Sequence, residues 1–147
     1  MMTEFFNDYF LNLDKKIRTI DSTELIKLSE LIYKSHSIGG KIIVIGNGGS
    51  AAIASHASID FTKAAKIRAI NFNESSLITC FSNDYGYEYW AEKAIEFYAD
   101  KNDLVILISS SGQSNNILNA ALKTKKMNIP LATLSGFSKD NELRTLG

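Results

Sequence analysis

Two short segments of this chain of 147 residues have residue types that suit the binding of an anion. The first is Gly46–Ser50, with the sequence GNGGS, which follows the apolar run Ile42–Ile45. Glycine permits positive φ angles and lets a ligand approach the backbone, and the start of a helix offers free N–H groups. The segment matches neither a Walker A loop nor the GxGxxG motif. We therefore expect a phosphate site of another kind, with Ser50 as the N-cap of the next helix.

A second segment repeats this pattern further along the chain. Asp103–Ser109 is an apolar strand, Ser110–Ser114 is a polar loop with one glycine, and Asn115–Lys126 has the apolar spacing of a helix. Ligands of parallel α/β sheets bind beyond the C-terminal ends of the strands. A lone glycine turn suits a steric role as well as a functional one, but two such loops at equivalent positions favour function. The sequence therefore predicts that both loops converge on one anion.

His56 and Asp60 form the third feature whose side chains could take part in catalysis or metal binding. They lie four residues apart on the helix expected after the glycine turn, and so share one face of it. Two donors cannot close a zinc site, which takes three or four ligands, and His36 is the only other histidine. Two interpretations stay open, namely part of a metal site completed from elsewhere or a local hydrogen bond on the helix surface.

Apolar runs that alternate with amphipathic helices predict an α/β fold, in which a parallel β-sheet is flanked by helices. Ser82–Gly86 is rich in turn formers and is expected to be a loop, followed by a long helix from about Tyr87. A last helix is expected over Asn141–Leu146. The four expected strands are Ile42–Ile45, Ile67–Phe72, Asp103–Ser109 and Ile129–Leu134.

The first 40 residues are expected to form a helical segment of their own, before an α/β domain over residues 41–147. Phe5–Ile20 has the spacing of an amphipathic helix. Its apolar stripe consists of Phe6, Tyr9, Phe10, Leu13 and Ile17. A stripe of this kind needs a partner, which is either its own domain or another subunit.

Composition limits the possible functions. The content of 45% hydrophobic and 22% charged residues is that of an ordinary globular domain. Sixteen basic and sixteen acidic residues cancel, so no overall field favours nucleic acid or an anionic membrane as a partner. No apolar run is long enough to span a bilayer. The single cysteine, Cys80, excludes an intrachain disulfide and fits a reducing, cytoplasmic location.

Three motifs, taken in order, resemble the sugar isomerase (SIS) family and, within it, the phosphoheptose isomerases. They are GNGGSAAxAxH at Gly46–His56, SNDYGYE at Ser82–Glu88 and ISSSGQSxN at Ile108–Asn116. The resemblance implies the SIS-domain fold, a flavodoxin-like three-layer sandwich with a five-stranded parallel sheet. It also implies a homotetramer with active sites between subunits, in which the N-terminal helix helps to form the core of the assembly.

The same resemblance implies roles for individual residues. His56 matches a zinc ligand, and Asp60 stands where these enzymes have a glutamate that serves as a ligand and as the proton-transfer base. Zinc is therefore the one cofactor that the resemblance allows. The residues that match substrate-binding or phosphate-binding positions are Asn47, Gly48, Gly49, Ser50, Asn83, Asp84, Ser109, Ser110, Ser111 and Ser114.

The function implied by the resemblance is the isomerisation of sedoheptulose 7-phosphate to glycero-manno-heptose 7-phosphate, for the heptose of lipopolysaccharide or capsule. Two departures bear on it. Asp60 is one methylene shorter than glutamate, and the family's last strand and C-terminal helix, which carries a Gln and a His, are missing. The chain is thus either a piece of a longer enzyme or a non-catalytic SIS module that binds a phosphosugar or a protein such as a replication initiator.

Overall fold

The structure, a computed structural model, describes residues 2–147 and contains two compact units. One unit ends at Glu30 and the other spans Leu31–Gly147, and each is described by itself. The functional division expected at residue 40 stays a prediction. Among the described residues, no helix combines the length and the apolar character that crossing a membrane requires.

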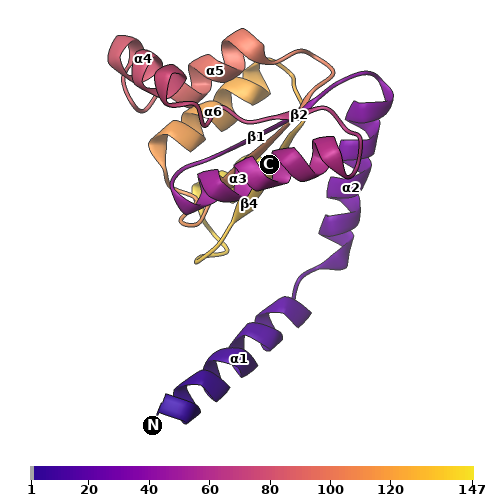
Figure 1. The fold of residues 1–147 in the computed structure, drawn as a ribbon, viewed down its shortest axis with the longest axis vertical. Coiled ribbons are helices and arrows are strands. Elements are labelled where there is room, and N and C mark those ends of the chain that lie inside the picture. Colours follow the sequence, from indigo (N-terminus) through magenta and orange to yellow (C-terminus); the bar gives the residue numbers. More distant parts are fainter. Residues whose placement is uncertain (1) are drawn as a thin grey trace. The chain divides into compact units, whose positions relative to one another are not determined.

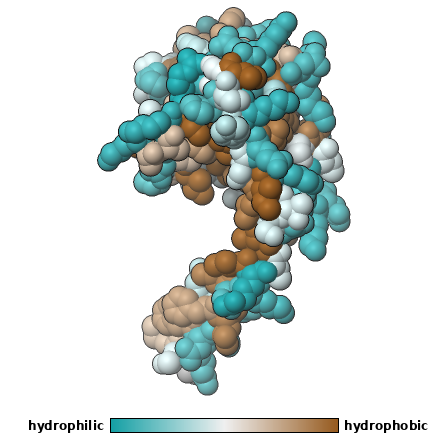
Figure 2. Space-filling model, turned by 90° about the vertical axis from the view of Figure 1, so that its right-hand side faces the viewer, coloured by the Kyte–Doolittle hydropathy of each residue, from teal (hydrophilic) through white to brown (hydrophobic). Residues whose placement is uncertain are grey.

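Helix α1 (Met2–Arg18) dominates the first unit and buries none of its described side chains within it. Four aromatic rings line up along the helix with centroids 5.5 to 6.5 Å apart, namely Phe5, Phe6, Tyr9 and Phe10. Leu13 and Ile17 continue the exposed apolar stripe, and Figure 2 shows hydrophobic side chains along this helix. The stripe predicted from the sequence is therefore confirmed as apolar surface. Helix α2 (Ser22–Ser37) follows after Asp21, whose carboxylate accepts a hydrogen bond from Thr23 N–H at 2.8 Å.

The second unit is built on a parallel sheet with helices around it (Figure 1), and its four described strands lie in the order β2-β1-β3-β4. The strands are β1 (Ile42–Gly46), β2 (Ala69–Ile70), β3 (Leu104–Ser109) and β4 (Leu131–Ser135). The register pairs Gly46 with Ile108 and Ser109 with Ser135. The C-terminal ends of β1, β3 and β4 therefore lie side by side at one edge of the sheet.

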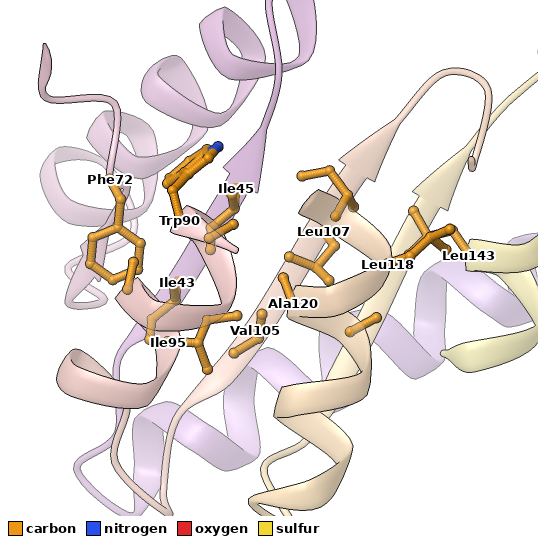
Figure 3. Packing of buried hydrophobic residues seen from close by; sticks show 14 of the residues in the cluster. Ile43, Ile45, Phe72, Trp90, Ile95, Val105, Leu107, Leu118, Ala120 and Leu143 are labelled. Carbon is orange, nitrogen blue, oxygen red and sulfur yellow. The ribbon is translucent and has the colours of Figure 1, made fainter. Parts of the chain in front are cut away.

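Helices cover the sheet on both faces, which confirms the expected three-layer α/β fold. Helix α3 (Gly49–Lys63) packs against β1 on one face. Helices α5 (Trp90–Tyr98) and α6 (Asn115–Lys126) pack against each other and provide the core of the other face (Figure 3). Helix α4 (Ser75–Tyr85) packs against α5, and the short α7 (Glu142–Leu146) packs against α6 and β4.

The two central strands are buried on both of their faces. All five residues of β1 and all six residues of β3 are buried. Ile43 and Val105 belong to the cluster under α5 and α6, while their neighbours Ile42 and Leu104 point to the opposite face. Trp90, at the start of α5, is 1% exposed in the same cluster. The continuous apolar runs in the sequence thus correspond to central strands, as predicted.

A partly buried ion pair holds the starts of β1 and β3 together at the opposite edge of the sheet. The Lys41 backbone N–H donates to Asp103 Oδ1 at 2.8 Å, and Lys41 Nζ lies 2.6 Å from Asp103 Oδ2. Lys41 Nζ also donates to Asp100 at 2.8 Å, and this hydrogen bond holds the pKa of the Asp100 carboxyl below its usual value. Burial alone would lower the pKa of Lys41, but the two carboxylates raise it above its usual value.

The prediction of a loop at Ser82–Gly86 is wrong, because the first four of these residues form the last turn of α4. This helix begins at a strong cap, since the Glu74 carboxylate accepts hydrogen bonds from the N–H groups of Ser76 and Leu77 at 3.0 and 2.8 Å. These bonds hold the pKa of Glu74 below its usual value. Phe81 of α4 packs against the core. Capping and burial therefore outweigh the local preference for a turn.

Other boundaries differ from the sequence predictions by smaller amounts. The strand expected over Ile67–Phe72 is reduced to Ala69–Ile70, and the long helix expected from Tyr87 begins at Trp90. The last helix is confirmed as α7, and the Asn141 side chain caps it by accepting a hydrogen bond from Arg144 N–H at 3.0 Å.

Candidate functional site

The glycine turn after β1 is built tightly. Gly46 ends the strand where an added Cβ would lie 2.7 Å from Ser50 Cβ, so only glycine fits there without a shift. Gly48 has a φ of +53° and is the N-cap of α3. The Ser50 N–H donates to the Asn47 carbonyl at 2.9 Å and closes the turn. The first turn of α3 therefore packs directly against the last residue of β1.

Ser50 does not cap α3, and this prediction is wrong. The helix begins at Gly49, one residue earlier than Ser50, and no side chain caps it. Gly48 adopts a backbone conformation that other residues rarely adopt, so the helix can begin before the serine. The Ser50 side chain lines the pocket described below.

The serine loop, residues 109–114, begins at the last residue of β3 and is held by hydrogen bonds to its own hydroxyl groups. The Oγ atoms of Ser109 and Ser114 lie 3.3 Å apart, and Ser109 Oγ accepts a hydrogen bond from Gly112 N–H at 3.2 Å. Ser111 Oγ accepts from Gln113 N–H at 3.2 Å. Ser114 is the N-cap residue of α6, and the first N–H groups of a helix have no partner within it. These N–H groups are donors suited to an anion.

An amide pair joins the two loops. Asn47 Nδ2 donates to Asn116 Oδ1 at 2.8 Å, and Asn116 Nδ2 donates to Asn47 Oδ1 at 2.8 Å. Asn116 lies in the first turn of α6 and is 3% exposed, whereas Asn47 is half-buried. The sequence motif contained Asn116, but sequence reasoning gave it no role.

The two loops border a pocket of about 200 Å³ at the C-terminal edge of the sheet. Its lining consists of Asn47, Ser50, Ile108, Ser109, Ser110, Ser111, Ser114 and Phe137. None of these side chains carries a formal charge, and most offer a hydroxyl or an amide. Such a pocket can bind a phosphate group through hydroxyl and backbone donors and the dipoles of two helices. The two loops thus converge on one pocket, whereas the anion expected there stays a prediction.

Phe137 is a pocket residue that sequence reasoning missed. It follows β4, whose end lies at the same edge as the two loops, and this position was the available signal. The residue is 90% exposed and its φ is +58°, which is unusual for an aromatic residue. The flanking backbone is fixed, because Gly136 N–H donates to the Ser110 carbonyl at 3.0 Å and Asn141 Nδ2 donates to the Ser138 carbonyl at 2.7 Å.

His56 and Asp60 form the expected pair on α3 but do not line this pocket. His56 Nε2 lies 3.3 Å from Asp60 Oδ2, and the side chains are 79% and 62% exposed. Asp60 is ten residues beyond Ser50, or ~15 Å along the helix axis. The pair is therefore open to solvent and lies outside the pocket.

The residues of this chain do not fit a zinc site by themselves. In residues 2–147 no group of three or more His, Cys, Asp or Glu side chains is placed to hold a metal ion. His56 and Asp60 supply two donors, whereas zinc takes three or four.

Asn83 and Asp84 lie apart from the serine pocket, on the last turn of α4. Asn83 Nδ2 donates to Asp84 Oδ1 at 2.9 Å, and both residues are exposed. They line a different, open hollow of about 650 Å³ together with Ser75, Ser76, Thr79 and Cys80. The structure thus brings together the serines and Asn47, but it does not bring Asn83 and Asp84 into the same pocket.

The chain matches known proteins over most of its length. A family model described as SIS domain matches residues 5–136. Phosphoheptose isomerase from Campylobacter jejuni subsp. jejuni serotype O:6 is 36% identical over 120 residues, covering 77% of this chain and 64% of that protein. Phosphoheptose isomerase from Cytophaga hutchinsonii is 33% identical over 132 residues, covering 86% of this chain and 66% of that protein. The chain therefore spans slightly less than two thirds of the length of these curated relatives.

A solved structure confirms the fold. Phosphoheptose isomerase GmhA from Neisseria gonorrhoeae has a TM-score of 0.88 to this chain at 25% sequence identity. The match covers 99% of this chain and 79% of that chain. The expected parallel sheet flanked by helices is thus the architecture shared with this relative.

Substitutions of two glycines test how the turn is built. Gly46→Ala should lower the free energy of unfolding by about 1–3 kcal/mol, because the new Cβ meets Ser50 at 2.7 Å and the backbone must shift. Gly49→Ala should change it by less than about 0.5 kcal/mol, because its added Cβ meets open space. Urea unfolding measures both values. Equal losses in the two variants would contradict the packing described for this turn.

Proposed function

Because the chain belongs to the SIS domain family, we propose that it is part of a phosphosugar isomerase resembling the phosphoheptose isomerases. The proposed reaction converts sedoheptulose 7-phosphate into glycero-manno-heptose 7-phosphate, for the synthesis of lipopolysaccharide or capsule heptose. The main support is the pocket of uncharged donors where the glycine turn and the serine loop meet. The similarity to two phosphoheptose isomerases over most of the chain supports the choice of substrate class.

In this proposal the pocket holds the phosphate group of the substrate. Ser109, Ser110, Ser111 and Ser114 supply hydroxyl or backbone donors from the serine loop, and Ser50 supplies a hydroxyl from α3. Asn47, Gly48 and Gly49 contact the substrate at the glycine turn. Asn83 and Asp84 bind the sugar only if α4 of this chain or of another copy lies along the substrate.

Asp60 is the proposed base. Ketose–aldose isomerisation removes a proton from C1 while the C2 carbonyl oxygen gains one, which gives an enediol. Return of a proton to C2 and loss of the proton on O1 then produce the aldose. Asp60 would carry the proton between C1 and C2, and His56, 3.3 Å away, would support the substrate. This arrangement requires the sugar chain to extend from the pocket along α3.

A non-catalytic module is the second candidate function. It is favoured by the position of Asp60, which does not line the pocket. Such a module would bind a phosphosugar, or a protein partner such as a replication initiator, without an acid–base set. Measured isomerase activity separates the two candidates.

We further propose a homo-oligomer in the cytoplasm, with the tetramer as the expected assembly. The exposed aromatic stripe of α1 supports the assembly, because apolar surface of this kind marks an interface. The single cysteine, Cys80, is free and exposed, which fits a reducing compartment.

Phosphate recognition predicts a difference between two ligands. Sedoheptulose 7-phosphate should raise the melting temperature of the chain, whereas free sedoheptulose should not. A ligand at one hundred times its Kd stabilises the native state by about 2.7 kcal/mol. Ser111→Ala and Ser114→Ala should each reduce the shift in a thermal melt. Ser37→Ala, which alters a hydroxyl at the end of α2, is the matched control and should leave it unchanged. Equal shifts with the two ligands would mean that the loops are only turns.

Asp60 is tested by removing its charge. In the full-length protein Asp60→Asn should lower the rate of isomerisation by at least about 100-fold, because a positioned base contributes this much or more. The stabilisation by sedoheptulose 7-phosphate should persist, since Asp60 does not line the phosphate pocket. Asp60→Glu should keep the activity. Conversion is followed by the appearance of the aldose, and an active Asp60→Asn variant would show that another group is the base.

The assembly is tested on α1. Phe10→Asp should dissociate the oligomer, because a buried, unpaired charge costs several kcal/mol, roughly. Lys15→Asp, on the opposite face of the same helix, should leave the assembly intact. Light scattering at micromolar concentration gives the mass of each variant. A monomeric wild-type protein would refute the proposed assembly.

A further inference from the structure

We infer that Asn116 is a positioning residue, which holds the side chain of Asn47 and thereby sets the spacing of the two anion-binding loops. This inference rests on the proposed function, since it concerns the same pocket. It assigns a role to a residue that does not line the pocket itself. Asn116 acts through Asn47, which does line it.

The contact between the two residues is a closed ring of hydrogen bonds. Each amide donates one N–H to the oxygen of the other, and both bonds measure 2.8 Å. A single hydrogen bond would let each side chain turn about it, whereas two antiparallel bonds fix the distance and the common plane of the two amides. One donor of each Asn amide is left over. The remaining N–H donor of Asn47 belongs to a residue that lines the pocket.

The amide pair is the side-chain link between the two loops. In the described residues no other side-chain hydrogen bond joins residues 46–50 to residues 109–116. Pairing of β1 with β3 fixes the spacing of the two backbones only as far as Gly46 and Ile108. Beyond that pair the backbones separate, one into α3 and the other through the serine loop into α6. The distance across the pocket therefore depends on Asn47 and Asn116.

The burial of Asn116 supports a role tied to its partner. It is 3% exposed and is followed on α6 by Ile117, which is fully buried in the core. A buried amide is destabilising unless its polar atoms are paired, and an apolar side chain would fill this position without that requirement. Packing alone thus gives no reason for asparagine here. The pair with Asn47 gives one.

The test separates positioning from packing by measuring binding and stability in the same variants of the full chain. Asn116→Leu keeps the branched outline of asparagine, although it is larger, and removes both hydrogen bonds. Asn116→Ala, which adds no volume, is a second variant in case leucine prevents folding. Calorimetry with inorganic phosphate and with sedoheptulose 7-phosphate gives the dissociation constants, and urea unfolding without ligand gives the stability. Asn119→Ala is the matched control, because Asn119 lies on the same helix and makes one hydrogen bond to the Glu88 carbonyl at 2.9 Å.

We expect Asn116→Leu to bind both ligands at least 10-fold more weakly while it unfolds cooperatively, and Asn119→Ala to bind them as the wild type does. Asn47→Ala should weaken binding as well. The double variant Asn47→Ala/Asn116→Leu should bind no more weakly than Asn47→Ala alone, because Asn116 acts only through Asn47.

Two results would count against the inference, and a third would count against the proposed function on which it rests. If the wild-type chain binds both ligands and folded variants of Asn116 bind them equally well, Asn116 does not position Asn47. Additive losses in the double variant would likewise overturn it, since they would mean that the two residues act independently. If the wild-type chain binds neither inorganic phosphate nor sedoheptulose 7-phosphate, the proposed function itself fails.

Discussion

The pairing of β1 with β3 is the constraint on which the candidate site depends. Both strands are buried on both faces, so a slip in register would move branched apolar side chains out of their places in two cores at once. The register puts Gly46 beside Ile108, and the two loops therefore leave the sheet next to each other. At the other edge, Lys41 and Asp103 hold the starts of the same strands together. The position of the pocket is thus set by the core.

Much of this fold is predictable from the residue pattern, and the exceptions have physical causes. The strands β1 and β3 and the helix α6 are long, uniform runs, so local pattern and tertiary packing agree there. The pattern fails at Ser82–Gly86, where the Glu74 cap and the packing of Phe81 extend α4 through turn-forming residues. It also fails at Ser50, because the positive φ of Gly48 lets α3 begin earlier. Both failures are places where a neighbour outweighs a local preference.

The candidate site is predictable only where its parts repeat a local pattern. Two polar loops after two apolar strands could be recognised, because parallel strands end at a common edge. The pair Asn47–Asn116 could not be recognised, since its members are 69 residues apart and the sequence around an asparagine does not indicate its hydrogen-bond partner. The position of Asp60 outside the pocket, by contrast, is consistent with the sequence, because ten residues of helix separate it from Ser50, or ~15 Å along the axis.

The uncharged lining of the pocket affects how an anion would reach it. Lysine and arginine attract a phosphate over a distance set by the Debye length, about 8 Å at physiological ionic strength. Hydroxyl and amide donors act only at contact, and the lining of this pocket holds no side-chain cation. A phosphorylated ligand would therefore form no ion pair with the lining, so added salt would have no such contact to screen. Helix dipoles act mainly within the first turn, so the choice among small phosphate esters would depend on their fit to the pocket.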